Sequence, residues 1–137
     1  MPAPHEYFEH GADIGVVGRG ASVEQAFVKA AESMFAIMTE PELVQPAVEF
    51  EVDFDEEDVE LALVRWLNAL LGASRERGLV LCRFELQRAG DHWRGHARGE
   101  RWRESHARGT EVKGATLTAL SVRHDETGWQ ARCVVDV

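Results

Sequence analysis

The sequence lacks several features that mark whole classes of protein. It contains only two cysteines, Cys82 and Cys133, which is too few for the disulfide framework of a small secreted domain. Both sit among apolar neighbours, so we expect two buried, reduced thiols. No stretch approaches the ~18 consecutive apolar residues that a membrane-spanning helix needs, and the first residues show no basic or apolar signal region. These absences predict a cytoplasmic protein without a membrane partner.

Positive charge is also scarce. Lys and Arg together number 15 against 24 Asp and Glu, a formal net charge of −9. Because nucleic-acid binding needs clustered basic residues that neutralise phosphates, this balance argues against a dedicated nucleic-acid binder. The charges are unevenly spread, with an acidic block from Glu49 to Glu60 and an arginine-rich stretch from Arg88 to Arg108. They form either two solvated faces or a polar surface that meets a partner.

The chain is long enough for one domain with a real core. It has 137 residues, of which 45% are hydrophobic and 28% charged, ordinary values for a globular protein. This length falls in the common single-domain range. We find neither an internal repeat nor a low-complexity linker. The sequence therefore predicts a single domain over residues 1–137.

Two helices follow from capping residues and apolar spacing. Ser22 with Gln25 forms a capping box before a stripe of apolar residues at helical spacing, and Pro41 ends that helix. The second helix is expected to begin at Asp55 as N-cap, with acidic residues at 56–58 favoured at its positive end. It should end at Gly78 in a left-handed conformation. Helix capping thus explains the acidic block without a metal.

The remaining segments alternate apolar and polar residues as strands do. Strands are predicted at residues 48–54, 80–87, 93–102, 111–124 and 129–137, with turns at 89–92 and 125–128. The order β-α-β-α followed by a β-rich half predicts an α+β fold. We expect two helices packed on a mixed or antiparallel β-sheet.

Motifs of self-sufficient enzymes are missing. The chain has no phosphate-binding Gly-x-x-x-x-Gly-Lys-Ser/Thr loop, and its glycines lack the spacing of a dinucleotide site. The cysteines are not paired at zinc-binding spacing, and the six histidines are scattered. This pattern favours a protein that assists another macromolecule over a hydrolase or transferase acting alone.

A few polar residues deserve a functional interpretation. His10 and Asp13 lie in a glycine-containing segment, Asp136 ends a strand of valines beside Val137, and Lys113 lies in a predicted strand. Each one alone is more commonly a surface or hydrogen-bonding residue. If Asp13 and Asp136 met on neighbouring strands, two carboxylates and the terminal carboxylate of Val137 would supply the oxygen ligands that Mg²⁺, Ca²⁺ or Mn²⁺ prefer.

Four segments in this order resemble the archease family over essentially the whole chain. They are Tyr7-Phe-Glu-His-Gly-Ala-Asp13, Trp66-Leu-Asn-Ala-Leu-Leu71, Gly99-Glu100 with Glu111-Val-Lys-Gly-Ala-Thr116, and Val134-Val-Asp-Val137. Two positions differ from the family's pattern: Gly11 stands where the family has Thr, and Thr118 stands where it has His.

The resemblance implies a cytoplasmic activator of RtcB-type RNA ligases, which act in tRNA splicing and RNA repair. Such proteins promote guanylylation of the ligase and multiple turnover, are not themselves enzymes, and meet RNA only through the ligase. The resemblance also implies a divalent metal ion held by Asp13, Asp136 and Val137, with Lys113 and His10 as possible accessory residues.

Two other functions stay open. One is a chaperone-like modulator of other nucleic-acid-processing proteins. The other is a metal-dependent phosphohydrolase, which is less well supported because no general base or phosphate cradle accompanies the carboxylates.

Overall fold

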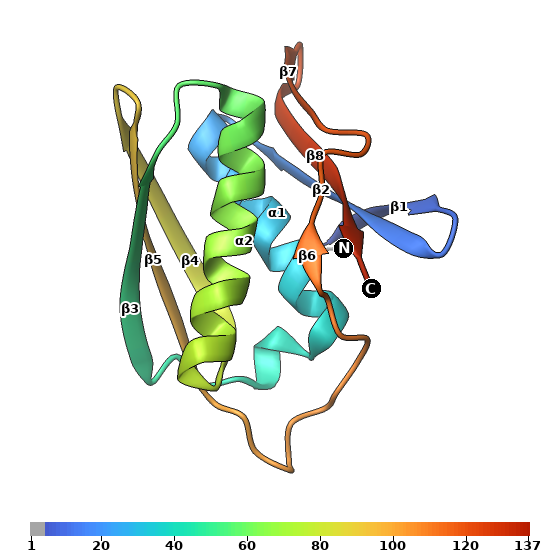
Figure 1. Ribbon diagram of the computed structural model, residues 1–137, viewed down its shortest axis with the longest axis vertical. Coiled ribbons are helices and arrows are strands. Elements are labelled where there is room, and N and C mark those ends of the chain that lie inside the picture. Colours follow the sequence, from blue (N-terminus) through green and yellow to red (C-terminus); the bar gives the residue numbers. More distant parts are fainter. Residues whose placement is uncertain (1–4) are drawn as a thin grey trace.

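The computed structural model describes residues 5–137 and arranges them as two helices between two antiparallel sheets (Figure 1). In chain order the elements are β1 (Glu6–His10), β2 (Asp13–Gly20), α1 (Val23–Met38), the short 3-10 helix η1 (Pro41–Leu43), β3 (Val48–Asp55), α2 (Val59–Arg77), β4 (Leu79–Ala89), β5 (His92–Arg101), β6 (Gly114–Ala115), β7 (Ser121–Asp125) and β8 (Gly128–Asp136).

The predicted α+β class is confirmed, but the strands divide into two sheets. One sheet runs β1-β2-β8, with β6 and β7 both paired to β8, and the other runs β3-β5-β4. All pairings are antiparallel. Helix α1 lies between the sheets and contacts β2, β8 and β4, whereas α2 lies in front of it in Figure 1. No helix in residues 5–137 is both long and apolar enough to cross a membrane.

Local sequence signals place both helices well, with one correction. The Ser22 hydroxyl accepts a hydrogen bond from the Gln25 N–H at 3.1 Å, as the capping box predicts. Helix α2, however, is capped by Asp58, whose Oδ1 accepts two backbone N–H groups. Asp55, the predicted cap, still belongs to β3, because its pairing with His92 continues that strand. Gly78 ends α2 at φ +66° as expected.

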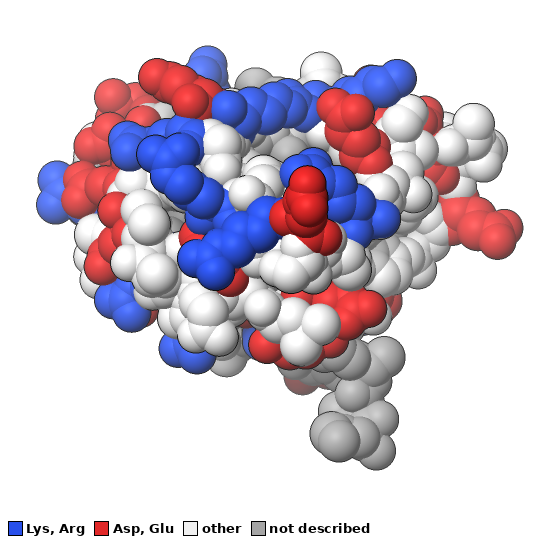
Figure 2. All heavy atoms as spheres, turned by 90° about the horizontal axis from the view of Figure 1, so that it is seen from below, with Lys and Arg blue, Asp and Glu red and all other residues white. Residues whose placement is uncertain are grey.

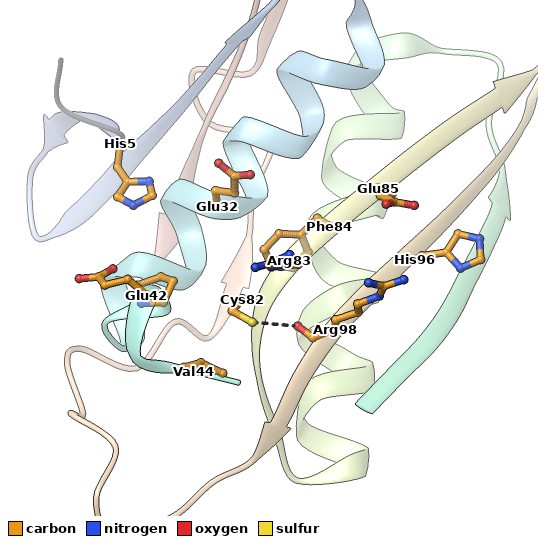
Figure 3. A pocket seen from close by; sticks show the side chains of 11 residues that line it. His5, Glu32, Glu42, Val44, Cys82, Arg83, Phe84, Glu85, His96 and Arg98 are labelled. Carbon is orange, nitrogen blue, oxygen red and sulfur yellow. Dashed lines mark hydrogen bonds between the residues drawn. The ribbon is translucent and has the colours of Figure 1, made fainter. Parts of the chain in front are cut away.

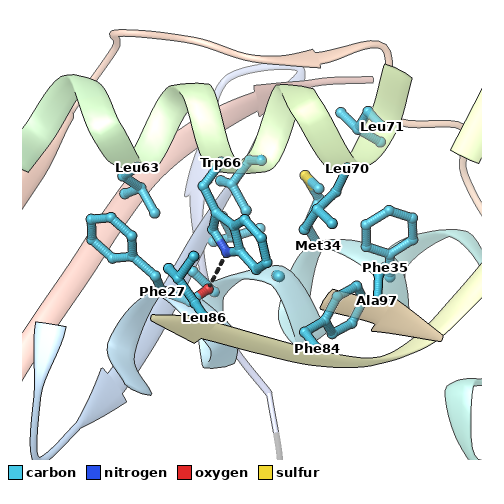
Figure 4. Packing of buried hydrophobic residues seen from close by; sticks show 14 of the residues in the cluster. Phe27, Met34, Phe35, Leu63, Trp66, Leu70, Leu71, Phe84, Leu86 and Ala97 are labelled. Atoms are coloured by element: carbon cyan, nitrogen blue, oxygen red, sulfur yellow. Dashed lines mark hydrogen bonds between the residues drawn. The ribbon is translucent and has the colours of Figure 1, made fainter. Parts of the chain in front are cut away.

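The core lies where the two helices face the two sheets (Figure 4). Trp66 of α2 is fully buried, and its indole N–H donates to the Phe27 carbonyl at 3.0 Å, so this large side chain leaves no polar atom unpaired. Gly95 on β5 makes room for the ring, since a Cβ there would lie 2.2 Å from Trp66. Full burial of a Leu, Ile or Phe side chain contributes roughly 1.5–3 kcal/mol, and Trp66 is larger than these.

The predicted strand at residues 111–124 is wrong. Only Gly114–Ala115 (β6) and Ser121–Asp125 (β7) are strands. Ala115 pairs with Val135, and Ser121 pairs with Arg132. The segment from 115 to 121 therefore advances six residues where β8 advances only three. The surplus residues must bulge away. They form a turn in which the Leu120 N–H donates to the Leu117 carbonyl at 3.4 Å, and the Val134 N–H of β8 donates to the Thr118 carbonyl at 3.0 Å.

The cysteines differ from each other. Cys133 on β8 is fully buried, as predicted. Cys82 is only partly buried, so the prediction is wrong there. The register of β4 against β5 shifts between Leu81 and Arg83, and this irregularity turns Cys82 out of the regular inward alternation.

Candidate functional site

The topology brings Asp13 and Asp136 to the same end of the larger sheet. Strands β2 and β8 are neighbours, with Ile14 opposite Val135. Continuing this register by one residue places Asp13 opposite Asp136. Directly opposed residues of an antiparallel pair point to the same face, with Cβ atoms roughly 4.5–5.5 Å apart. This register places the two residues on the same face at the same end of the sheet.

Val137 joins this pair through its main chain. Its N–H donates to Asp13 Oδ1 at 3.2 Å. Asp13 is half-buried and Asp136 is exposed, so this hydrogen bond orients the less accessible carboxylate while the other stays open to solvent.

His10 lies on the same side of the molecule but is not part of a three-side-chain cluster. It pairs with Asp13 across the β1–β2 hairpin. The hairpin loop contains Gly11 at φ +61°, a conformation that favours glycine. Within residues 5–137, no three His, Cys, Asp or Glu side chains gather so that they could hold a metal ion. A cation at the aspartates would therefore have no third His, Cys, Asp or Glu ligand among these residues.

Lys113 is positioned by its backbone. Its N–H donates to the Asp136 carbonyl at 2.8 Å, and the next residue, Gly114, pairs with Asp136 in β6. The Lys113 side chain itself is exposed. The structure thus places the backbone of Lys113 beside Asp136.

Two residues of α2 hold this segment, and our sequence reasoning did not single them out. Asn68 clamps Ala115 with two hydrogen bonds, donating to its carbonyl at 3.2 Å and accepting from its N–H at 2.9 Å. Arg75 donates to the carbonyls of Lys113, at 2.8 Å, and of Val112. The signal was present for Asn68, a polar residue inside the Trp66–Leu71 helical stretch.

Glu100 belongs to a segment that carries the family resemblance, but its role was not predicted. Its side chain is buried, and Oε2 accepts from the Gln45 N–H at 2.7 Å and from His106 Nε2 at 3.1 Å. These donors, the Gln45 N–H first, hold the pKa of the Glu100 carboxyl below its ordinary value. His106 Nδ1 accepts from the Arg103 N–H at 2.9 Å, which leaves the proton on Nε2. Glu100 therefore anchors the loop at residues 102–113.

A separate cavity of about 630 Å³ lies between η1, α1 and the edge strand β4 (Figure 3). Cys82, Arg83, Glu85 and His96 are among the residues that line it. The Cys82 thiol contacts the Arg98 carbonyl at 3.5 Å, and burial raises the pKa of this thiol, which disfavours the reactive thiolate. None of the predicted site residues lines this cavity.

Known proteins similar to this chain agree on one family. Residues 5–137 match the Archease protein family. The chain is 34% identical to the protein archease of Methanosarcina mazei, over 97% of this chain and 95% of that protein. It is 33% identical to the protein archease of Sulfolobus acidocaldarius, over 96% and 97%. The solution structure of Methanobacterium thermoautotrophicum protein 1598 superimposes with a TM-score of 0.82 at 30% identity, covering 98% of this chain and 99% of that one.

Proposed function

Because the chain belongs to the archease family, we propose that it activates an RtcB-type RNA ligase. In this proposal it acts in the cytoplasm as a protein cofactor that promotes guanylylation and multiple turnover of the ligase in tRNA splicing or RNA repair. The observation that carries the proposal is the arrangement of Asp13, Asp136 and Val137. This arrangement brings together the segments 7–13 and 134–137, which both carry the family resemblance, at one accessible end of the sheet.

The donor set at this end suits a hard divalent cation. Asp13 and Asp136 offer carboxylate oxygens, and the carboxylate of Val137 is the proposed third ligand, because the Val137 N–H donates to Asp13 Oδ1 at 3.2 Å and so holds this residue next to Asp13. Such an all-oxygen set suits Ca²⁺, Mg²⁺ or Mn²⁺ better than Zn²⁺, which favours sulfur and nitrogen. When bound, the cation supplies positive charge that stabilises phosphate oxygens. The Val137 N–H orients the Asp13 carboxylate, and Asp136 is exposed.

Two modes of activation are compatible with this surface. The carboxylate end can dock beside the nucleotide pocket of the ligase and complete its metal site. Alternatively, the domain can bind more tightly to the guanylylation-competent conformation of the ligase and raise its population. Lys113 borders the aspartates in both cases and offers a cation to an acidic or phosphate group of the complex.

The test is guanylylation of an RtcB-type ligase from the same source. We expect the wild-type protein to raise the rate and to allow repeated turnover with GTP and Mn²⁺ or Mg²⁺. Asp136→Ala should abolish the stimulation. Asp91→Ala, which removes an exposed carboxylate from the β4–β5 turn, is the matched control and should stimulate fully. If the wild-type protein has no effect on the ligase, the proposal is wrong.

The chaperone-like alternative gives a different result in the same assay. A general folding aid would raise the amount of active ligase without changing the rate per active molecule, and Asp136→Ala would retain this effect. A phosphohydrolase would release phosphate from nucleotides with no ligase present. Each outcome would replace the activator proposal.

A further inference from the structure

The arginine-rich stretch of the sequence is divided by the fold. Arg94 and Arg98 lie on the outer face of the smaller sheet and pair with Glu51 and Glu49 of β3 at 3.4 and 3.3 Å. The later arginines continue past β5 into the loop at residues 102–113. There they meet the end of α2, which contributes two more arginines that are distant in the sequence.

We call this region the basic end. It comprises six exposed basic residues: Arg75, Arg77, Arg101, Arg103, Arg108 and Lys113. Segments 75–77 and 101–113 hold six of the 15 Lys and Arg residues of the chain but only three of its 24 Asp and Glu residues. Viewed from this side, Lys and Arg side chains form a band across the face, with acidic side chains at its edges and also within it (Figure 2).

The loop that carries these residues is fixed rather than free. The N–H groups of Gly109 and Thr110 donate to carbonyls at the end of α1 at 2.9 and 3.1 Å. Gly109 packs so closely that a Cβ would lie 2.2 Å from the Ile37 carbonyl oxygen. Glu100 and His106 anchor the other side of the loop. A ligand would therefore meet basic residues whose backbone is already ordered, which lowers the entropic cost of binding.

Flat side chains lie among the charges. The Arg108 guanidinium covers the Trp102 ring at 4.1 Å from its centroid, and Arg108 is exposed. Both residues line a cavity of about 420 Å³, together with Met38, Leu71 and Arg75. Aromatic rings and guanidinium planes are the surfaces on which proteins stack unpaired bases. The basic end thus combines phosphate-binding charge with a stacking surface.

We propose that the basic end binds single-stranded nucleic acid directly. Phosphates contact the exposed basic residues, among which Arg103 also pairs with Glu100 at 3.4 Å, and a base stacks on Arg108 and Trp102 at the mouth of the cavity. The net charge of −9 does not prevent this binding. Salt at physiological concentration screens each charge over a distance of about 8 Å, so the acidic groups elsewhere on the protein have little effect at the basic end. An acidic surface of a partner protein would also complement the positive charge of the basic end. It would give no role to the stacking of Arg108 on Trp102.

This inference concerns the protein alone and does not depend on ligase activation. It also has a geometric link to the aspartate pair. Arg75 donates to the Lys113 carbonyl, and the Lys113 N–H donates to the Asp136 carbonyl. A single-stranded nucleic acid bound at the basic end would consequently extend toward the end of the sheet that carries Asp13 and Asp136.

The experiment is fluorescence anisotropy of labelled 20-nucleotide oligo-U and oligo-dT with the full-length protein. If about four phosphates are engaged, raising salt from about 50 to 200 mM should weaken binding roughly 50-fold. The triple variant Arg101→Ala, Arg103→Ala, Arg108→Ala should lose binding at least tenfold. The charge-matched control Arg88→Ala, Arg94→Ala, Arg123→Ala, which alters other surfaces, should change it less than twofold.

A second variant separates stacking from charge. Arg108→Lys keeps the positive charge but removes the planar group, so affinity should fall severalfold while the salt slope stays the same. Circular dichroism and thermal melting confirm that each variant folds. Absence of measurable binding by the wild-type protein, or equal losses in both triple variants, would overturn the proposal. Loss of ligase binding without any oligonucleotide binding would instead identify the basic end as a protein interface.

Discussion

The backbone N–H of Val137 donates to Asp13 Oδ1 at 3.2 Å, which joins two residues 124 positions apart. This contact gives the two aspartates different roles. Asp13 orients the last residue as well as offering a carboxylate, whereas Asp136 is exposed and offers a carboxylate only. Substitutions at the two positions should therefore agree in their effect on cation binding and differ in their effect on stability.

We expect Asp13→Ala and Asp136→Ala each to weaken Ca²⁺ or Mn²⁺ binding by the isolated protein strongly, as measured by calorimetry or by terbium luminescence. The double variant should bind little worse than either single one, because both carboxylates act on one ion. Asp136→Ala should change the free energy of unfolding by no more than ~0.5 kcal/mol. Asp13→Ala should cost about 1 kcal/mol through the lost hydrogen bond.

Asp91→Ala again serves as the control for a general loss of negative charge. Full additivity of the two single substitutions, or unchanged cation binding in Asp136→Ala, would show that the aspartates do not share an ion. In that case activation of the ligase would have to come from the conformational mode alone.

Asn68 should matter for order at the site rather than for the core. Asn68→Ala removes both hydrogen bonds to Ala115 and should destabilise the protein by about 1–2 kcal/mol. Hydrogen exchange should speed up at residues 113–116 and leave α1 unchanged. Glu76→Ala, at an exposed position of the same helix, is the control. Uniformly faster exchange would instead indicate a global loss of stability.

The two thiols should react at different rates. Burial raises the pKa of Cys133 to about 12, so at pH 8 it is a protonated, inaccessible thiol. Cys82 is partly exposed, although burial raises its pKa too. Iodoacetamide should therefore modify Cys82 slowly in the native protein and Cys133 only after unfolding, as mass spectrometry would show. Equal native labelling of both residues, or preferential labelling of Cys133, would contradict the packing of β8.

Glu100 should make stability depend on pH in the acid range. Its pKa is lower in the folded protein than in the unfolded chain, where it is near ~4.3. The ionised form is thus favoured by folding, and this stabilisation is fully present above about pH 5. It is lost as the pH falls through the folded-state pKa. Glu100→Gln should lower the melting temperature at pH 7 and flatten its decline below about pH 5.

The control for this effect is Glu104→Gln, an exposed carboxyl in the same loop. It should reproduce the wild-type decline in melting temperature. If Glu100→Gln declines with pH as steeply as the wild-type protein, the acid sensitivity comes from other carboxyls.

Local patterns predicted the helices because capping and apolar spacing act within one or two turns. Ser22 and Gly78 perform the predicted roles. The patterns failed at Asp55 and at residues 111–124, where pairing with a distant strand decides the outcome. Asp55 pairs with His92 of β5 and so remains in β3. Two separate pieces of the predicted strand, β6 and β7, pair with β8. The β1–β2 hairpin, with its glycine turn at Gly11, was likewise not resolved from the sequence.

By itself, the sequence determined the α+β class, both helices and the final hairpin, and its family resemblance implied the residues of the proposed metal site. Only the tertiary structure decided which of these residues meet. Asp13 and Asp136 become neighbours because β2 pairs with β8, and the basic end forms because the end of α2 lies against the loop after β5. Such contacts join residues far apart in the chain, and their energies depend on the packing of both sheets around α1, which no local pattern encodes.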